Sequence, residues 1–296
     1  MDDQASALRQ TPIPPSPNRA WRCLAVGSGK GGVGKTMVSL GLAYSLVNLG
    51  RRVLLVDADL GLANVDLQAG VDPRFTLQDV LFGKCVLADA VIRIRQGPDI
   101  LAAASGSPEM VDLGSARRRL LVEDLIRFAA GYEFVILDVG AGIGQNVTAF
   151  LAAAPEALVV VANEPTSLMD AYALIKTVSR QPDPPVMAAV INMVRSQEEG
   201  FLLGSRIQAI ARQHLGLDLR VAGVIPYDRL VPDAIRARRS IALFAPQSPP
   251  ALALAALARD IAAGRGRLTP GWKPQDRLIE KLASLGIPPG TGEVAG

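Results

Sequence analysis

The chain has 296 residues, a formal net charge of +3, 49% hydrophobic and 20% charged residues, a composition typical of a globular protein with a large core. Its single histidine, His214, excludes a multi-histidine metal site and suggests no Ser-His-Asp triad, and two distant cysteines, Cys23 and Cys85, form no zinc ribbon, iron–sulfur cage or disulfide framework. The small net charge argues against a dedicated nucleic-acid binder.

The N-terminal residues predict a short element outside the folded domain. Residues 1–10 are polar with helical propensity, and Asp2 or Asp3 can serve as the N-cap. Residues 11–21 contain four prolines, which cannot continue a helix and favour an extended chain. We therefore expect a tethered element at 1–10 and a proline-rich linker at 11–21. The start of the chain does not resemble a secretory signal, so we expect a cytoplasmic protein.

Between residues 22 and 264, short continuous apolar runs alternate with longer helical segments. Continuous runs favour strands that are buried on both faces. Strands are predicted at 23–28, 53–57, 100–104, 134–138, 158–162, 186–192 and 221–225, and helices at 36–49, 115–130, 145–153, 167–180, 198–214, 232–239 and 250–263. This alternation predicts one α/β domain with a doubly wound, mostly parallel sheet of seven or eight strands and helices on both faces.

Residues 265–296 predict a tail that carries one amphipathic helix, at 275–285. Four apolar side chains share helical spacing there: Leu278, Ile279, Leu282 and Leu285. Such a helix would bind an anionic membrane surface weakly and reversibly. The alternative is that its apolar face packs on the domain, because the helix carries only two cations, Arg277 and Lys281. No apolar run reaches the roughly 18 residues that a membrane span needs.

A glycine-rich loop lies between the first predicted strand and helix and fits the pattern GxxxxGK[ST]. It consists of Gly29, Lys30, Gly31, Gly32, Val33, Gly34, Lys35 and Thr36. Small glycines let backbone N–H groups close around phosphate oxygens, and the helix that follows points its N-terminus at the anion. Lys35 would supply a charge to the outer phosphates, and the Thr36 hydroxyl would ligate Mg²⁺. The loop therefore predicts a nucleotide site.

Carboxylates follow two of the predicted strands. Asp57 and Asp59 end the second strand, and Asp138 ends the strand at 134–138. In doubly wound sheets, ligands bind at the carboxyl ends of the strands. We expect Asp57 near the metal and phosphates, and Asp138 to contact Mg²⁺ through water. Gly140 and Gly142 would let the segment after Asp138 move.

The second lysine of the loop, Lys30, is not explained by the basic pattern. Together with the loop it forms KGGxGK[ST], which resembles the MinD/ParA class of P-loop ATPases. The resemblance implies an ATP-dependent homodimer in which Lys30 reaches the nucleotide of the partner copy. It also implies that Asp59 positions the attacking water, that Asn64 belongs to a switch, that Asn192 recognises adenine, and that Pro226, Tyr227 and Asp228 line the base pocket. Val139 stands where relatives usually carry threonine.

Three segments resemble the FlhG (FleN) group of flagellar-number regulators within this class. They are DADLGLANVD at 57–66, NEPTSLMDAYALIK at 163–176, and the pattern DQAxxLR, which Asp3, Gln4, Ala5, Leu8 and Arg9 supply. The resemblance implies that the N-terminus activates the GTPase FlhF. It also implies flagellar C-ring proteins or a flagellar transcription regulator as further partners, and reversible association with the inner face of the cytoplasmic membrane.

Three alternatives stay open. A MinD-type division-site ATPase is disfavoured by the DQAxxLR pattern. A ParA-type DNA partition ATPase would show more clustered basic residues, so nucleic acid is not an expected partner. A scaffold without turnover is compatible with Val139, because it departs from the usual threonine in the second switch of this class, which is the segment that follows Asp138.

Overall fold

The computed structural model describes residues 21–59, 64–103 and 115–264. The predicted element at 1–10, the linker up to residue 20 and the tail at 265–296 with its helix at 275–285 lie outside the described residues. Within the described ranges, no helix combines the length and the apolar character needed to cross a membrane.

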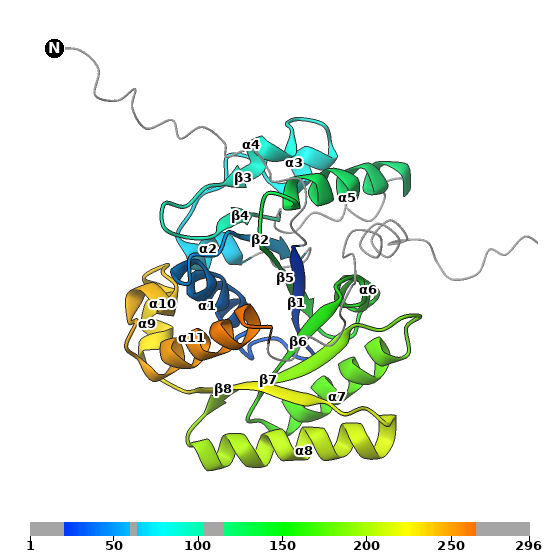
Figure 1. Ribbon diagram of the computed structural model, residues 1–296, viewed down its shortest axis with the longest axis vertical. Coiled ribbons are helices and arrows are strands. Elements are labelled where there is room, and N and C mark those ends of the chain that lie inside the picture. The colour runs from blue at the N-terminus through cyan, green and yellow to red at the C-terminus, as the bar shows by residue number, and fades with distance from the viewer. Residues whose placement is uncertain (1–20, 60–63, 104–114, 265–296) are drawn as a thin grey trace, which may run out of the picture.

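The core of the fold is one eight-stranded sheet with the order β3-β4-β2-β5-β1-β6-β7-β8 (Figure 1). All neighbouring strands are parallel except β3 and β4. The strands are β1 (Arg22–Ser28), β2 (Val53–Ala58), β3 (Val91–Ile92), β4 (Asp99–Leu101), β5 (Phe134–Ala141), β6 (Glu156–Ala162), β7 (Val186–Val194) and β8 (Arg220–Pro226). The predicted doubly wound, mostly parallel sheet is confirmed.

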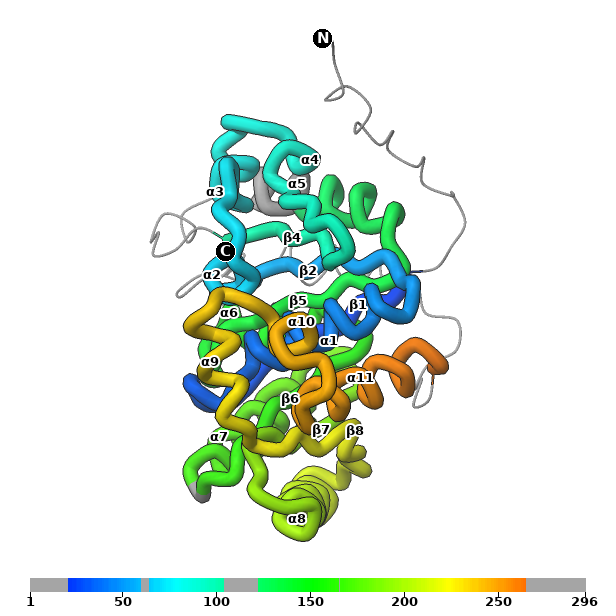
Figure 2. Tube along the Cα trace, turned by 90° about the vertical axis from the view of Figure 1, so that its left-hand side faces the viewer, coloured from blue at the N-terminus to red at the C-terminus, as the bar shows by residue number. Residues whose placement is uncertain are grey.

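Helices cover both faces of this sheet (Figures 1 and 2). One face carries α1 (Lys35–Asn48), α9 (Leu230–Arg236), α10 (Ile241–Phe244) and α11 (Pro249–Ala262). The other face carries α5 (Ser115–Ala129), α6 (Gln145–Ala153), α7 (Pro165–Ser179) and α8 (Gln197–Leu215). Three short helices lie near the β3 end of the sheet: α2 (Val65–Ala69), α3 (Leu77–Leu81) and α4 (Leu87–Ala90).

The continuous apolar runs supply two separate cores. Successive side chains of a strand point to opposite faces, so Leu54 joins the core under α5 to α8, whereas Leu55 joins the core under α1 and α11. Both side chains are fully buried. A strand in the middle of this sheet therefore needs apolar residues at every position, which is why its sequence does not alternate.

Strand order brings the predicted site residues to one edge. From β1 the chain passes to β2 on one side, and β6 lies on the other side of β1. Ligands of doubly wound sheets bind at such a switch point, beyond the carboxyl ends of the strands. Asp138 on β5 is in register with Asp57 on β2 and with Val26 on β1. Carboxylates from two strands thus meet beside the loop that follows β1.

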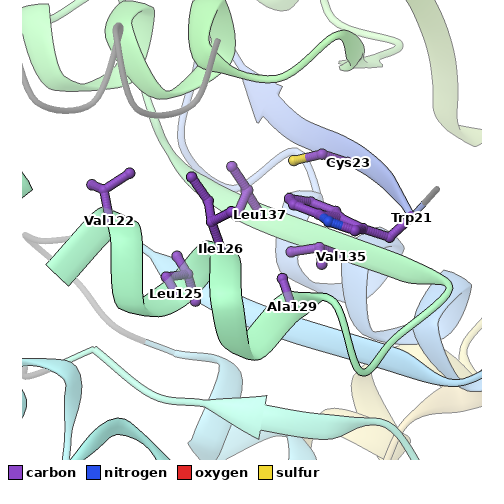
Figure 3. Close-up of a pocket in the computed structure, with 8 residues that line it drawn as sticks. All are labelled: Trp21, Cys23, Val122, Leu125, Ile126, Ala129, Val135 and Leu137. Carbon is purple, nitrogen blue, oxygen red and sulfur yellow. The ribbon is translucent and has the colours of Figure 1, made fainter. Parts of the chain in front are cut away.

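One domain boundary is corrected by the structure. The linker prediction includes Trp21, but its side chain is 2% exposed and belongs to the core. With Cys23 it lines a small apolar cavity between α5 and strands β1 and β5 (Figure 3). Burial raises the pKa of the Cys23 thiol well above its usual range, so this cysteine is an inert core residue.

Candidate functional site

The glycine-rich loop connects β1 to α1 and adopts a conformation that only glycine accepts readily. Gly32 and Gly34 have φ angles of 79° and 85°, the left-handed region that is costly for other residues. Gly34 is the N-cap of α1 and makes no side-chain cap, which leaves backbone N–H groups at the helix N-terminus for an anion. The predicted phosphate loop therefore has the backbone form that its sequence requires.

Neighbouring elements hold this loop tightly. Asn192 lies near the end of β7 and is 1% exposed. Its side-chain amide nitrogen donates a hydrogen bond to the Val33 carbonyl at 2.8 Å. A Cβ added at Gly34 would lie 2.4 Å from that nitrogen, and one added at Gly29 would lie 2.1 Å from the Asp170 carbonyl oxygen on α7. Asn192 thus anchors the loop, and adenine recognition by its side chain stays a prediction.

A buried cluster joins α1 to the end of β5. The Lys35 ammonium lies 3.0 Å from Asp138 Oδ2, and the Thr36 hydroxyl donates to the same oxygen at 2.8 Å. The Ser39 hydroxyl donates to the other oxygen, Oδ1, at 2.6 Å. All four side chains are buried. The structure therefore brings together the three predicted residues Lys35, Thr36 and Asp138 and adds a fourth, Ser39.

Asp57 is fully buried and fixes the segment that follows β2. Its carboxylate accepts backbone N–H groups from Asp59 at 3.0 Å and from Asn64 and Val65 at 3.1 Å each. Burial, followed by the charge of Asp138, raises the pKa of Asp57 to about 7, although these N–H donors act in the opposite direction. Asp57 therefore holds the backbone at Asp59, Asn64 and Val65, and nucleotide contact by Asp57 stays a prediction.

Asp59 lies between the loop and the segment after β5. Its Oδ2 is 3.9 Å from the Lys35 ammonium, and a Cβ added at Gly140 would lie 3.2 Å from its Oδ1. Asp59 therefore lies near both Lys35 and the segment that follows Asp138, and the positioning of water by Asp59 stays a prediction. Val139, between Asp138 and Gly140, is fully buried in the core, so its side chain contributes to packing.

Lys30 contacts its own chain in this structure. Its ammonium lies 2.5 Å from Glu164 Oε2 and 3.0 Å from the Thr166 hydroxyl at the start of α7. The Lys30 and Glu164 side chains are 38% and 56% exposed, so the ion pair is accessible to solvent. The predicted role of Lys30 across a dimer stays a prediction.

The residues predicted to line a base pocket lie where β7 and β8 end side by side, and the pocket itself stays a prediction. Pro226 is in register with Val194, and the Tyr227 backbone N–H donates to the Val194 carbonyl at 2.8 Å. The Tyr227 side chain is 57% exposed. The Asp228 carboxylate accepts the N–H of Leu230, the first residue of α9, at 2.8 Å. The segment 226–228 is therefore held by backbone and side-chain hydrogen bonds, and Tyr227 is open to solvent. It directly follows Ile225, the residue that is in register with Asn192.

The residues present fit a magnesium ion that arrives with a nucleotide. No group of three or more His, Cys, Asp or Glu side chains that could hold a metal occurs in the described ranges. Mg²⁺ commonly binds through one or two carboxylates and the phosphates of its substrate, with several waters retained. The Asp138 carboxylate and the Thr36 hydroxyl beside the phosphate loop supply such oxygen donors.

Two residues of this site, Ser39 and Glu164, are not predicted by the sequence patterns described above. Ser39 lies three positions after Thr36, which places both on the same face of α1, and this spacing is the signal that could have found it. Glu164 lies two residues after the end of β6, in the segment 163–176 whose sequence resembles the FlhG group.

Comparison with known proteins settles the family. The model of the CobQ/CobB/MinD/ParA nucleotide binding domain matches residues 24–241. The chain belongs to this family. Antiactivator FleN of Pseudomonas aeruginosa is 42% identical over 238 residues, which cover 80% of this chain and 85% of FleN. Flagellum site-determining protein YlxH of Helicobacter pylori is 33% identical over 224 residues, 75% of this chain and 76% of YlxH.

Solved MinD structures share the fold of this MinD/ParA family member. The MinC:MinD cell division protein complex of Aquifex aeolicus gives a TM-score of 0.68 at 26% identity, covering 84% of this chain and 99% of that chain. MinD of Pyrococcus horikoshii, which was solved with Mg-ADP, gives the same TM-score and identity over 83% of this chain and 98% of that chain. The predicted resemblance to the MinD/ParA class is confirmed.

Proposed function

We propose that this protein is an ATP-binding and ATP-hydrolysing dimerisation switch that regulates flagellar number and placement. The observation that carries the nucleotide part is the buried contact of Lys35 and Thr36 with Asp138 beneath a loop with left-handed glycines. Burial of charged groups is costly in free energy unless they pair with each other or bind a ligand. A nucleotide with Mg²⁺ is the ligand for which these residue types are suited.

Each residue has a defined part in the proposed hydrolysis. Lys35 would leave Asp138 to bind the outer phosphates, while Thr36 and Asp138 would hold the metal. A bound Mg²⁺ would supply positive charge to the phosphate oxygens. Asp59 orients the attacking water from its place between Lys35 and Gly140. Lys30 leaves Glu164 and contacts the nucleotide of a second copy, which makes dimerisation depend on ATP.

The flagellar part of the proposal rests on the named relatives and on the N-terminal pattern. FleN and YlxH are two relatives whose names refer to an antiactivator and to flagellum site determination, respectively. The DQAxxLR pattern of residues 3–9 is the proposed activator of the FlhF GTPase. We also propose that the protein is cytoplasmic and associates reversibly with the inner face of the cytoplasmic membrane through residues 275–285. Its further proposed partners are flagellar C-ring proteins or a flagellar transcription regulator.

Phosphate release by the purified full-length chain tests the nucleotide proposal. We expect Mg²⁺-dependent ATP hydrolysis that Lys35→Ala lowers by about 100-fold or more, since one charged donor to the transferring group is lost. Lys84→Ala is the control, because Lys84 pairs with Asp79 on a remote helix. Normal hydrolysis by Lys35→Ala would contradict the phosphate-loop assignment, whereas nucleotide binding without turnover in the native chain would favour the scaffold alternative.

FlhF GTPase activity tests the partner proposal. We expect the full-length chain, and a peptide of residues 1–10, to stimulate FlhF. Leu8→Ala and Arg9→Ala should abolish the effect, while Ser6→Ala, at a position that the pattern leaves free, should keep it. A chain that hydrolyses ATP but does not affect FlhF would favour a MinD-type or ParA-type role. Liposome flotation with ATP, with and without residues 272–296, tests the membrane part.

A further inference from the structure

We propose that Ser39 is a positioning residue for the magnesium ion: it holds the Asp138 carboxylate in the orientation that receives the metal. This inference deepens the proposed function and rests on it. Its basis is the buried hydrogen bond from Ser39 on α1 to Asp138 on β5, two residues that are 99 positions apart in the sequence.

The two oxygens of Asp138 have different partners. Oδ2 receives the Lys35 ammonium at 3.0 Å and the Thr36 hydroxyl at 2.8 Å. Oδ1 receives the Ser39 hydroxyl at 2.6 Å. Lys35 and Thr36 are the residues that turn to phosphate and metal when a nucleotide binds. Ser39 lies one turn further along α1 and is 0% exposed, so its bond to Oδ1 can persist throughout.

A fixed Oδ1 determines where Oδ2 points. The hydrogen bond to an ionised carboxylate is short and charge-assisted, which makes it one of the stronger kinds in proteins. Rotation of the carboxylate about its Cβ–Cγ bond would break this bond and leave a buried oxygen without its donor, which is costly. Outer partners of this kind commonly set the affinity of a metal site, even though they do not touch the metal.

A purely structural role for Ser39 makes a different prediction. Buried helix serines often only bond back to the carbonyl four residues earlier, and the Ser39 hydroxyl is also 3.2 Å from the Lys35 carbonyl. Ser45 provides the matched case on the same helix: it is buried, and its hydroxyl donates to the Gly41 carbonyl at 2.7 Å. Ser45→Ala therefore controls for the loss of a buried helix hydroxyl away from Asp138.

The test is a magnesium titration of nucleotide binding by the full-length chain. A fluorescent ATP analogue is bound first in excess chelator and then at rising Mg²⁺. We expect Ser39→Ala to raise the Mg²⁺ concentration for half-maximal tightening by about 10- to 100-fold, with the affinity in chelator unchanged. Ser45→Ala should follow the native titration, and Ser39→Thr, which keeps a hydroxyl, should recover most of the loss.

Two results would overturn the inference. One is a Ser39→Ala titration that coincides with that of Ser45→Ala. The other is an equal loss of nucleotide affinity with and without Mg²⁺, which would indicate a general packing defect. Thermal unfolding in chelator shows whether the variants fold. If Ser39→Ala does not fold, Ser39→Cys replaces it in the titration, because a thiol has nearly the same shape as the hydroxyl but is a weaker donor. A native chain that binds no nucleotide would overturn the proposed function itself.

Discussion

The Lys30 ammonium and the Glu164 carboxylate lie 2.5 Å apart within one chain. Lys30 belongs to the phosphate loop and Glu164 to the segment between β6 and α7, so the pair joins two elements beside the switch point of the sheet. If Lys30 must reach a second copy, this contact competes with dimerisation. The isolated chain and the proposed dimer therefore differ in the partner of one lysine.

Glu164→Gln should make ATP-dependent dimerisation tighter. Both side chains are partly exposed, and an ion pair of this kind contributes about 0–1 kcal/mol, so the expected gain is up to about fivefold in the dimer association constant. Sedimentation with ATP and Mg²⁺ measures it. Glu198→Gln, on the exposed first turn of α8, is the charge-matched control. Weaker dimerisation of Glu164→Gln alone would show that Glu164 supports the dimer instead.

Asp59→Ala should separate nucleotide binding from hydrolysis. Asp59 is 3.9 Å from Lys35 but is not among the residues that hold Asp138, so ATP affinity should change little. Loss of the group that orients water should slow the chemical step by about 100-fold. Single-turnover phosphate release and a dissociation constant for ATP measure the two quantities.

The control for Asp59→Ala is Asp72→Ala, which removes a highly exposed carboxylate that pairs with Arg238. Comparable losses of ATP affinity and of turnover in Asp59→Ala would argue against a role confined to water.

Gly29→Ala should destabilise the protein even without nucleotide. The new methyl group would lie 2.1 Å from the Asp170 carbonyl oxygen, so the loop or α7 must shift, at a cost of about 1–3 kcal/mol. Gly31→Ala is the matched control in the same loop, because a Cβ there meets nothing within 4 Å. Chemical denaturation of the nucleotide-free variants compares them, and equal stabilities would contradict the close approach.

Tyr132→Phe should destabilise the protein more at high pH than at low pH. The Tyr132 hydroxyl donates to Asp99 Oδ2 at 2.6 Å. Burial raises the pKa of Asp99, while this bond lowers it. Because the folded pKa is raised, the folded state binds more protons in the window above the usual pKa, and stability falls as pH rises through that window.

Without the tyrosine donor, the ionised form of Asp99 is penalised further. The expected loss in the free energy of unfolding is about 1–3 kcal/mol at neutral pH and above, and smaller near pH 4. Tyr172→Phe, whose ring contacts His214 edge-on, is the control. A pH-independent loss would assign the effect of Tyr132→Phe to packing alone.

The sequence alone determined the fold class, and it pointed to the loop at 29–36 and the carboxylates at strand ends as the candidate site. Continuous apolar runs such as 134–138 predict doubly buried strands, because a central parallel strand has a core on each face. The segment 29–36 predicts a phosphate loop, because its chemistry depends on neighbouring residues in one turn. Both patterns are local, and local patterns can be interpreted without knowledge of the strand order.

Only the tertiary structure decided the short elements and the partners of the site residues. The two-residue strand β3 and the five-residue helix α3 are too short to have a periodic signal, and they are stabilised by packing. Ser39 meets Asp138, and Lys30 meets Glu164 134 positions away, because β5 and β6 lie on either side of β1. Strand order is set by the burial of the whole sheet, so no local segment contains it.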